Sequence, residues 1–300
     1  MENKRLVICT SDGCIDIAGD EYKKYNIDIL RLHVTFRGKE YLEGYDLDTA
    51  KFYEELEKLE DAKNNLPRTS MPSIGEVKER FDAAIKNGYD EVFAVIISTG
   101  LSATYDVVCK AAEEYRDKLT IHVINSRINS FNVGLIAVKI AQWISDGMSS
   151  ENILKEVEWI KKHQEFFGVD GKLDYLIYNG RLKGGKALIA KMLSICPVVG
   201  FDRDGVLSSW EKVRTQKKAI ARCCEILKEK IGDRDPKDYV LWHCYTGPSL
   251  LPILQENEKM LGIQTNHNPV MMSAVSGSHN GPWFVGYGLM FLRRDDEPLE

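Results

Sequence analysis

The chain has 300 residues, of which 44% are hydrophobic and 28% are charged, and its formal net charge is −5. These are the proportions of an ordinary globular protein, so they disfavour a disordered, collagenous or coiled-coil chain, and a chain this long needs no disulfide or metal crosslinks to fold. The acidic balance, without any block of like charge, argues against nucleic acid as a partner, because phosphate binding favours a clustered basic face.

No segment has the length of a membrane span. The longest purely apolar run covers residues 92–97, whereas a spanning helix needs about 20 residues. The apolar run after Met1–Arg5 has only four residues, which is too short for the core of a secretion signal. We therefore expect no stable membrane insertion and a cytoplasmic location. The seven cysteines form no C-x-x-C pair, so we expect no metal site either.

The first half of the chain predicts alternating strands and helices. The expected strands cover residues 6–9, 27–36, 92–97 and 120–124. The expected helices run from Asp48 to about Glu60, from Ser73 to near Gly88, and from about Ser102 to Tyr115. A long helix is expected after Asn125-Ser126 as far as Gly147, and another from Ser149 or Ser150 to about His163. Alternation of this kind indicates parallel β-α-β units.

Hydroxyl or amide residues follow three of these strands, at Thr10-Ser11, Ser98-Thr99 and Asn125-Ser126. The carboxyl ends of strands in a doubly wound parallel sheet share one edge, where ligands bind. Thr10, Ser98 and Ser126 are therefore candidates for a secondary part of a binding site.

The pattern changes near residue 165, which predicts two domains, residues 1–165 and 166–300. The second half is expected to contain a strand at 166–169, short helical pieces on both sides of 179–185, a hairpin over 195–213, a helix from Thr215 to Ile231, a strand at 239–245, a helix opened by Pro248, and strands near 270–275 and 285–292.

Two hydroxyl-rich segments precede predicted helices. Residues 68–73 are expected to form a loop that ends in Ser73, whose spacing from Glu76 is that of a helix capping box, and residues 98–104 link a buried strand to a helix through Gly100. Each segment is interpreted first as hydroxyls that cap a helix, with an anion site at the helix start as the alternative. The second segment is neither a P-loop nor a G-x-S-x-G elbow, because the required glycines are missing.

Two further candidates lie in the second half. His279 stands in a predicted glycine-rich turn over residues 276–282, where a ligand or backbone is able to approach closely. Arg181 stands in the turn 179–185, and it is either a solvated surface side chain or a recognition site for an anion or a partner.

Taken in order, these motifs resemble those of the DegV family of bacterial fatty-acid-binding proteins over nearly the whole chain. The family's T-S-x-P-S motif is matched at residues 69–73, its S-S-x-L-S-G-T-Y motif at 98–105, and its D-S-x-x-x-S segment at 125–130. Its opening strand and turn are approximated at 8–12, its L-x-x-G-G-R-I turn at 176–182, its proline strand and D-G hairpin at 196–205, and its H-x-G-P-G turn at 279–283.

The resemblance implies a two-domain α/β fold, with an N-terminal Rossmann-like parallel sheet, a C-terminal α/β domain and a ligand tunnel between them. It implies a carrier, not an enzyme, that binds a long-chain fatty acid without a cofactor. The carboxylate would be held by Thr69, Ser102 and His279, with Ser70 and Gly281 as further candidates. Some family members present the acid to a separate fatty acid kinase.

Two other functions stay open on the residues alone. One is an acyl-transfer enzyme that uses Ser102 as nucleophile and His279 as base, although no acidic residue that would orient the imidazole is evident. The other is a nucleotide- or phosphate-binding module, which rests only on the predicted sheet edge. Trp283 stands where the family has glycine, so we expect its indole to shorten the cavity, and the chain length of the ligand stays open.

Overall fold

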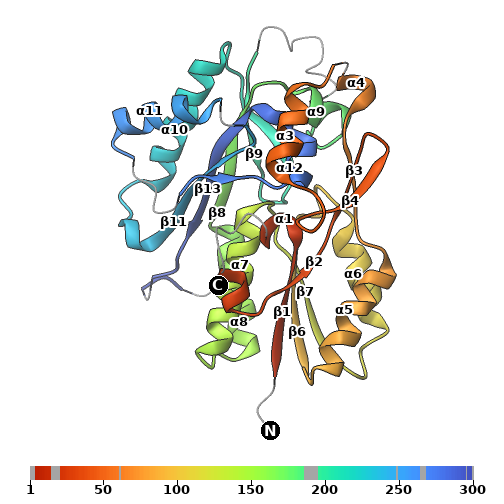
Figure 1. The fold of residues 1–300 in the computed structure, drawn as a ribbon. Coiled ribbons are helices and arrows are strands. Elements are labelled where there is room, and N and C mark those ends of the chain that lie inside the picture. The colour runs from red at the N-terminus through yellow and green to blue at the C-terminus, as the bar shows by residue number, and fades with distance from the viewer. Residues whose placement is uncertain are drawn as a thin grey trace.

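The structure is a computed structural model that describes residues 4–14, 21–60, 62–185, 195–247, 249–263, 268–294 and 296–298 (Figure 1). The strands are β1 (Arg5–Thr10), β2 (Asp28–Leu30), β3 (His33–Phe36), β4 (Lys39–Leu42), β5 (Arg68–Ser70), β6 (Glu91–Ile96), β7 (Thr120–Asn125), β8 (Gln164–Asp170), β9 (Val198–Phe201), β10 (Leu207–Glu211), β11 (Tyr239–Tyr245), β12 (Val270–Met271) and β13 (Phe284–Phe291).

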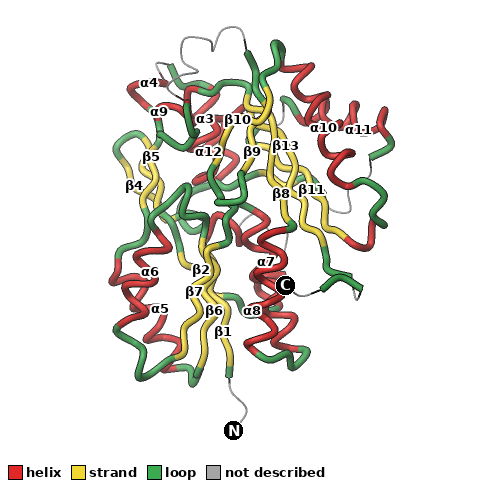
Figure 2. Tube along the Cα trace, turned by 180° about the vertical axis from the view of Figure 1, so that it is seen from behind, coloured by secondary structure: helices red, strands yellow, loops and turns green. Residues whose placement is uncertain are grey.

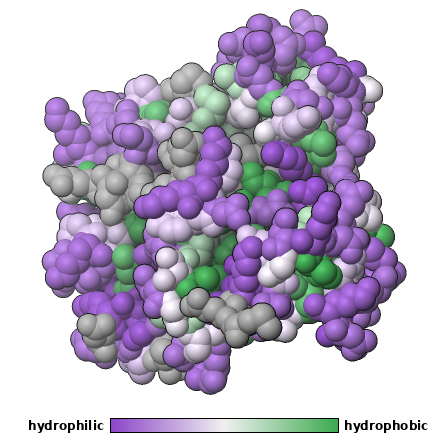
Figure 3. All heavy atoms as spheres, turned by 60° about the horizontal axis from the view of Figure 1, so that its bottom comes forward, coloured by the Kyte–Doolittle hydropathy of each residue, from purple (hydrophilic) through white to green (hydrophobic). Residues whose placement is uncertain are grey.

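The helices are α1 (Ser11–Cys14), α2 (Glu21–Lys24), α3 (Thr49–Glu57), α4 (Ala62–Asn65), α5 (Ile74–Lys86), α6 (Thr104–Glu113), α7 (Phe131–Ser145), α8 (Ser150–Lys162), α9 (Asp174–Tyr178), α10 (Gln216–Ile231), α11 (Leu251–Leu261) and α12 (Ala274–Asn280), with short 3₁₀ helices η2 (Pro236–Asp238) and η3 (Gly281–Trp283). Figure 3 shows one face of the molecule, which is mostly hydrophilic, with apolar side chains gathered in recesses near its middle.

The first sheet has the strand order β2-β1-β6-β7, and each of its pairings is parallel. Side chains alternate between the two faces of a strand. In β1, Leu6 and Ile8 pack in the cluster that contains α5 and α6 residues, whereas Val7 and Cys9 pack in the cluster that contains α7 and α8 residues. Helices therefore cover both faces, as Figure 2 shows, and the predicted parallel β-α-β architecture is confirmed.

The second sheet has the order β10-β9-β8-β13-β11-β12, and its pairings are antiparallel except for the parallel pair β11 and β12. One face packs against α10 and α11. The other face presents Phe166, Trp242 and Phe284 to a cluster that also contains Phe131 of α7. The two sheets therefore share one apolar core through α7.

A third, small antiparallel sheet has the order β4-β3-β5. It comes from the first half of the sequence, but its apolar side chains meet the second half. Val34 of β3 and Phe52 of α3 pack in one cluster with Tyr175 of α9 and Val275 of α12. This contact brings β5 next to α12, which matters for the site described below.

The single strand expected over residues 27–36 is wrong, because the chain forms β2 and β3 in two different sheets. Leu32 lies between them, and its backbone bonds to other partners. Its N–H donates to Ser11 Oγ at 2.9 Å, and its carbonyl accepts from the N–H of Glu43 at 3.0 Å. Arg31 also donates to the carbonyl of Glu43 at 2.7 Å. These bonds take the place of ladder bonds at the break.

Two other expectations from the pattern are wrong. The strand expected near residues 270–275 has only two residues, since Ser273 accepts a hydrogen bond from the N–H of Ser276 and begins α12. Residues 68–70 form β5 and not a loop. Pro248 and the helical piece expected after Gly185 (residues 186–194) lie outside the described residues, and α11 begins at Leu251.

The capping box predicted at the start of α5 is confirmed. Ser73 Oγ accepts from the N–H of Glu76 at 3.2 Å, and the Glu76 carboxylate accepts from the N–H of Ser73 at 2.7 Å. We expect Ser73→Ala to lower the free energy of unfolding by about 1 kcal/mol, because it leaves a helix N–H without its partner. Urea unfolding measures this, with Ser70→Ala as the control, since the exposed Ser70 caps no helix. Equal stability of the two variants would contradict it.

Candidate functional site

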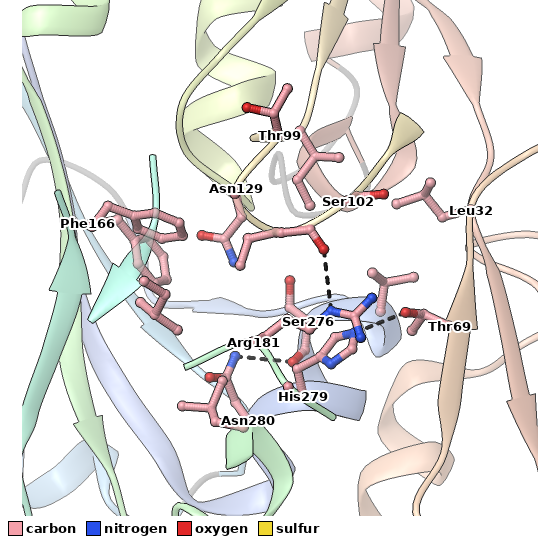
Figure 4. Close-up of a pocket in the computed structure, with 18 of the residues that line it drawn as sticks. Leu32, Thr69, Thr99, Ser102, Asn129, Phe166, Arg181, Ser276, His279 and Asn280 are labelled. Carbon is pink, nitrogen blue, oxygen red and sulfur yellow. Dashed lines mark hydrogen bonds between the residues drawn. The ribbon is translucent and has the colours of Figure 1, made fainter. Parts of the chain in front are cut away.

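A cavity of about 560 Å³ lies where the carboxyl edge of the parallel sheet meets the second sheet and α12 (Figure 4). One part of its wall is apolar and aromatic. The side chains there come from β8, β9, β10 and β13, namely Phe166, Val199, Phe201, Leu207 and Phe284. Polar side chains gather elsewhere in the lining, namely Thr69, Ser102, Arg181 and His279. The cavity therefore joins an apolar part to a polar end.

Thr69 and His279 meet at the polar end. Thr69 lies in β5, opposite Val34 of β3. Its Oγ1 shares a hydrogen bond of 2.8 Å with Nε2 of His279, which is 210 residues away in the sequence. The glycine-rich turn expected around His279 is instead the last turn of α12, which ends at Gly281 with a φ of 67°. A helix, and not a loop, fixes the imidazole.

The His279 imidazole is neutral near pH 7. Burial, with a smaller contribution from the Arg181 guanidinium, lowers its pKa to about 3. Its Nδ1 is buried and has no hydrogen-bond partner among the described residues. The neutral ring carries a single proton, so either Nε2 or the Thr69 hydroxyl is the donor in the bond that they share.

Ser102 lies just before α6 and lines the cavity. Its Oγ shares a hydrogen bond of 2.8 Å with Thr104 Oγ1 and accepts from the N–H of Thr104 at 3.3 Å. The hydroxyl thus helps to shape the start of α6, although Ala103, the N-cap residue, makes no side-chain cap. The hydrogen bonds described for Ser102 and His279 run to Thr104 and Thr69, so the structure does not join the two as a nucleophile and its base.

Arg181 reaches the same cavity from the turn after α9. Its Nε donates to the carbonyl of Leu101 at 3.3 Å, and its Nη1 donates to the carbonyl of Asn179 at 2.6 Å. Partial burial lowers its pKa from the ordinary 12.5, and a guanidinium remains charged at neutral pH. The residue considered earlier as a surface anion or partner site therefore supplies a positive charge to the polar end.

The other candidates from the sequence fall into two groups. Ser70 lines the cavity. Thr10, Ser98 and Ser126 are buried outside its lining, and their hydroxyls bond to backbone. Thr10 Oγ1 accepts from the N–H of Ile97 at 3.2 Å, Ser98 Oγ donates to the carbonyl of Gly205 at 2.6 Å, and Ser126 Oγ donates to the carbonyl of Ile128 at 3.1 Å. These three build the sheet edge.

Gly281 and Trp283 also lie outside the cavity lining. A Cβ added at Gly281 would come within 2.7 Å of the Tyr175 ring, so glycine is needed for packing. The Trp283 ring lies under Lys172, with Nζ 3.9 Å from its centroid. The expectation that its indole shortens the cavity is therefore not met. The next residue, Phe284, forms part of the wall instead.

Sequence reasoning missed Glu43, which positions α12. Its Oε1 accepts from the N–H of Val275 in the first turn of α12, and its Oε2 accepts from Ser11 Oγ, each at 2.6 Å. Burial raises the pKa of Glu43 to about 7, and burial raises that of neighbouring Asp12 to about 6. A single glutamate after a short strand gives no pattern from which this bridge could have been inferred.

The described residues contain no group of three or more histidine, cysteine, aspartate or glutamate side chains arranged to hold a metal ion. Within the same part of the chain, no helix combines the length and the apolar character that crossing a bilayer requires.

Comparison with known proteins gives a consistent result. The model of the family described as "Uncharacterised protein, DegV family" matches residues 6–292. The DegV protein of Bacillus subtilis is 31% identical over 281 residues, which cover 93% of this chain and 97% of that protein. A DegV domain-containing protein of Listeria innocua is 32% identical over 240 residues, covering 80% and 82% of the two chains.

Solved structures agree with this result. A DegV family protein of Streptococcus agalactiae, described as fatty-acid-binding, superposes with a TM-score of 0.86 at 26% identity, over 97% of this chain and 100% of that one. The Bacillus subtilis DegV structure, also described as a fatty-acid-binding protein, gives a TM-score of 0.82 at 29% identity over the same shares. The two-domain α/β fold is shared with these structures.

Proposed function

This chain belongs to the DegV family, and on that basis we propose that it binds a long-chain fatty acid in the cavity between its two sheets. The carboxylate binds at Thr69, Ser102 and His279, and the acyl chain lies along the aromatic wall. The observation that carries this proposal is the hydrogen bond between Thr69 and His279, because it sets paired polar groups at the polar end of a cavity that also has an aromatic wall.

The chemistry of the two parts of the cavity matches the two parts of a fatty acid. A carboxylate that leaves water is costly unless several donors meet it, and bonds from hydroxyl and guanidinium groups to a carboxylate are of the stronger, charge-assisted kind. When Nε2 carries the single proton of the neutral His279 imidazole, it donates to Thr69 Oγ1, and the Thr69 hydroxyl proton is free for the carboxylate. Arg181 adds the compensating charge, since the His279 imidazole is neutral. The acyl chain gains about 0.8 kcal/mol for each methylene buried. The cavity volume of about 560 Å³ lies within the usual range of small-molecule sites.

We further propose that the protein is a carrier that presents the acid to a separate fatty acid kinase in the cytoplasm, without chemistry or a cofactor of its own. Ser70 and Met71 line the cavity and also reach the surface, with Met71 44% exposed. Both adjoin Thr69, so a partner that docks over β5 gains access to the bound carboxylate. As part of the same proposal, residues 1–165 and 166–300 form two domains, and the ligand tunnel lies between them.

Binding is tested directly with purified protein. We expect native mass spectrometry of protein from cells to show the added mass of an aliphatic acid. After delipidation, a C16 or C18 acid at a hundredfold excess over its Kd should raise the melting temperature by about 4 °C, because the ligand binds only the folded state. Absence of both effects would rule out the proposal.

Hydrolysis of a p-nitrophenyl ester that disappears in Ser102→Ala would instead favour acyl transfer, and a rise in melting temperature with ATP would favour nucleotide binding.

A further inference from the structure

Asn129 places an unsatisfied amide inside the cavity. The residue is 7% exposed, it lines the cavity, and its Oδ1 is buried without a hydrogen-bond partner. Figure 4 shows this side chain pointing into the cavity between Phe166 and the polar end. A buried amide without partners costs free energy, so its presence beside an aromatic wall requires a reason.

Within the described part of the chain, each of the other buried asparagines makes a side-chain hydrogen bond. Asn132 Oδ1 accepts from Trp242 Nε1 at 3.0 Å, and Asn179 Nδ2 donates to the carbonyl of Ser278 at 2.9 Å. Asn280, which also lines the cavity, donates from Nδ2 to the carbonyl of Ser276 at 3.0 Å. Among the buried asparagines of the described residues, Asn129 is the one whose amide oxygen is buried without a hydrogen-bond partner.

The backbone around Asn129 is held in place. Arg127 and Ser130 both have left-handed φ values, of 57° and 58°, which residues other than glycine adopt only where their surroundings enforce them. The carbonyl of Ile128 accepts from the N–H of Ser98 at 2.9 Å, and the N–H of Ser130 donates to Asp12 Oδ2 at 3.0 Å. These bonds tie both sides of Asn129 to the sheet edge, so its amide stays directed at the cavity.

We propose that Asn129 is a polar subsite for a hydroxyl group carried on the acyl chain, so that the preferred ligand is a hydroxylated long-chain fatty acid. This inference rests on the proposed function, since the carboxylate must bind at the Thr69 end. The amide accepts from the hydroxyl through Oδ1 and donates to it through Nδ2. A methylene at the same place leaves the amide unsatisfied, so the subsite favours the hydroxylated chain and disfavours the plain one.

The test compares stearic acid with a series of hydroxystearic acids that carry the hydroxyl at different carbons, all titrated into delipidated protein. We expect one isomer to bind the wild-type protein about tenfold more tightly than stearic acid does. Asn129→Leu should bind stearic acid more tightly than the wild type does and should lose the preference for that isomer. Leu207→Ala is the matched control, because it removes an apolar contact from both ligands and should leave their ratio unchanged.

The outcomes separate the two proposals. If stearic acid binds but no isomer exceeds it, or if Asn129→Leu keeps the preference, the subsite is disproved and fatty acid binding stands. If neither acid binds the wild-type protein, fatty acid binding itself fails. Should Asn129→Leu not fold, Asn129→Ala replaces it, because the smaller side chain removes the amide without filling the space.

Discussion

Thr69→Val is expected to weaken the binding of a C16 or C18 fatty acid by between about tenfold and a hundredfold. Valine keeps the shape of threonine but removes the hydroxyl, so the carboxylate loses one hydrogen bond and Nε2 of His279 loses its partner. A hydrogen bond to a charged group contributes about 1.5–3 kcal/mol, which corresponds to this change in Kd. Isothermal titration of the delipidated protein gives the value directly.

Thr35→Val provides the matched control for this measurement. Thr35 lies in the same small sheet, in β3 opposite Arg68, but its side chain is exposed and lines no part of the fatty acid cavity. We expect its Kd to equal that of the wild type. A folded Thr69→Val protein that binds with wild-type affinity would place the carboxylate elsewhere and would refute the assignment of the polar end.

Glu43→Gln is expected to stabilise the protein by about 3 kcal/mol at pH 8 and by only about 1 kcal/mol at pH 5. In the folded protein the pKa of Glu43 is raised from the ordinary 4.5 to about 7, because its carboxyl is buried. Between about pH 4.5 and pH 7 the folded state therefore holds a proton that the unfolded state has released. The free energy of unfolding then falls as pH rises through this window, by about 1.4 kcal/mol for each pKa unit.

Glutamine remains uncharged and still offers an oxygen to the N–H of Val275, so it avoids the cost of ionisation above pH 7. Urea unfolding of both proteins at pH 5 and pH 8 isolates this effect, since other titrating groups are common to the two. Glu54→Gln, on the exposed side of α3, should change neither value. If the difference in free energy of unfolding between Glu43→Gln and the wild type is the same at both pH values, Glu43 has an ordinary pKa.

Local patterns in the sequence predicted the elements whose causes are local. The capping box at Ser73, the buried run of β6 and the helix after Thr215 depend on neighbours within a few residues, and the structure has them where they were expected. The break at Leu32 depends on Ser11 and Glu43, and the early end of β12 depends on Ser273. The contacts of Leu32 with Ser11 and Glu43 join residues that do not share a short window of the sequence. The cap at Ser273 is local, but the expected strand over residues 270–275 did not take it into account.

The site shows the same limit. Thr69, Ser102 and His279 were selected because they stand in recognisable motifs, and the structure brings all three into one cavity. Thr10, Ser98 and Ser126 have the same kind of motif, but their hydroxyls bond to backbone. Asn129 stands at an unspecified position of the segment 125–130, so the motif did not single it out. A hydroxyl after a strand is able either to line the cavity or to bond to nearby backbone. The position of the neighbouring backbone in the folded protein decides which of the two it does.

The long sequence separations within the site set an order on its formation during protein synthesis. The residues of β1, β6 and β7 have all been synthesised by Asn125. The partner of Thr69, His279, is synthesised 210 residues after it, and the partner of Glu43, Val275, is synthesised 232 residues after it. At about 5–20 residues per second, the ribosome takes roughly 8–30 seconds to extend the chain from Asn125 to His279. A growing polypeptide therefore carries a formed parallel sheet well before it is able to take up a ligand, and lipid loading is an event of the finished chain.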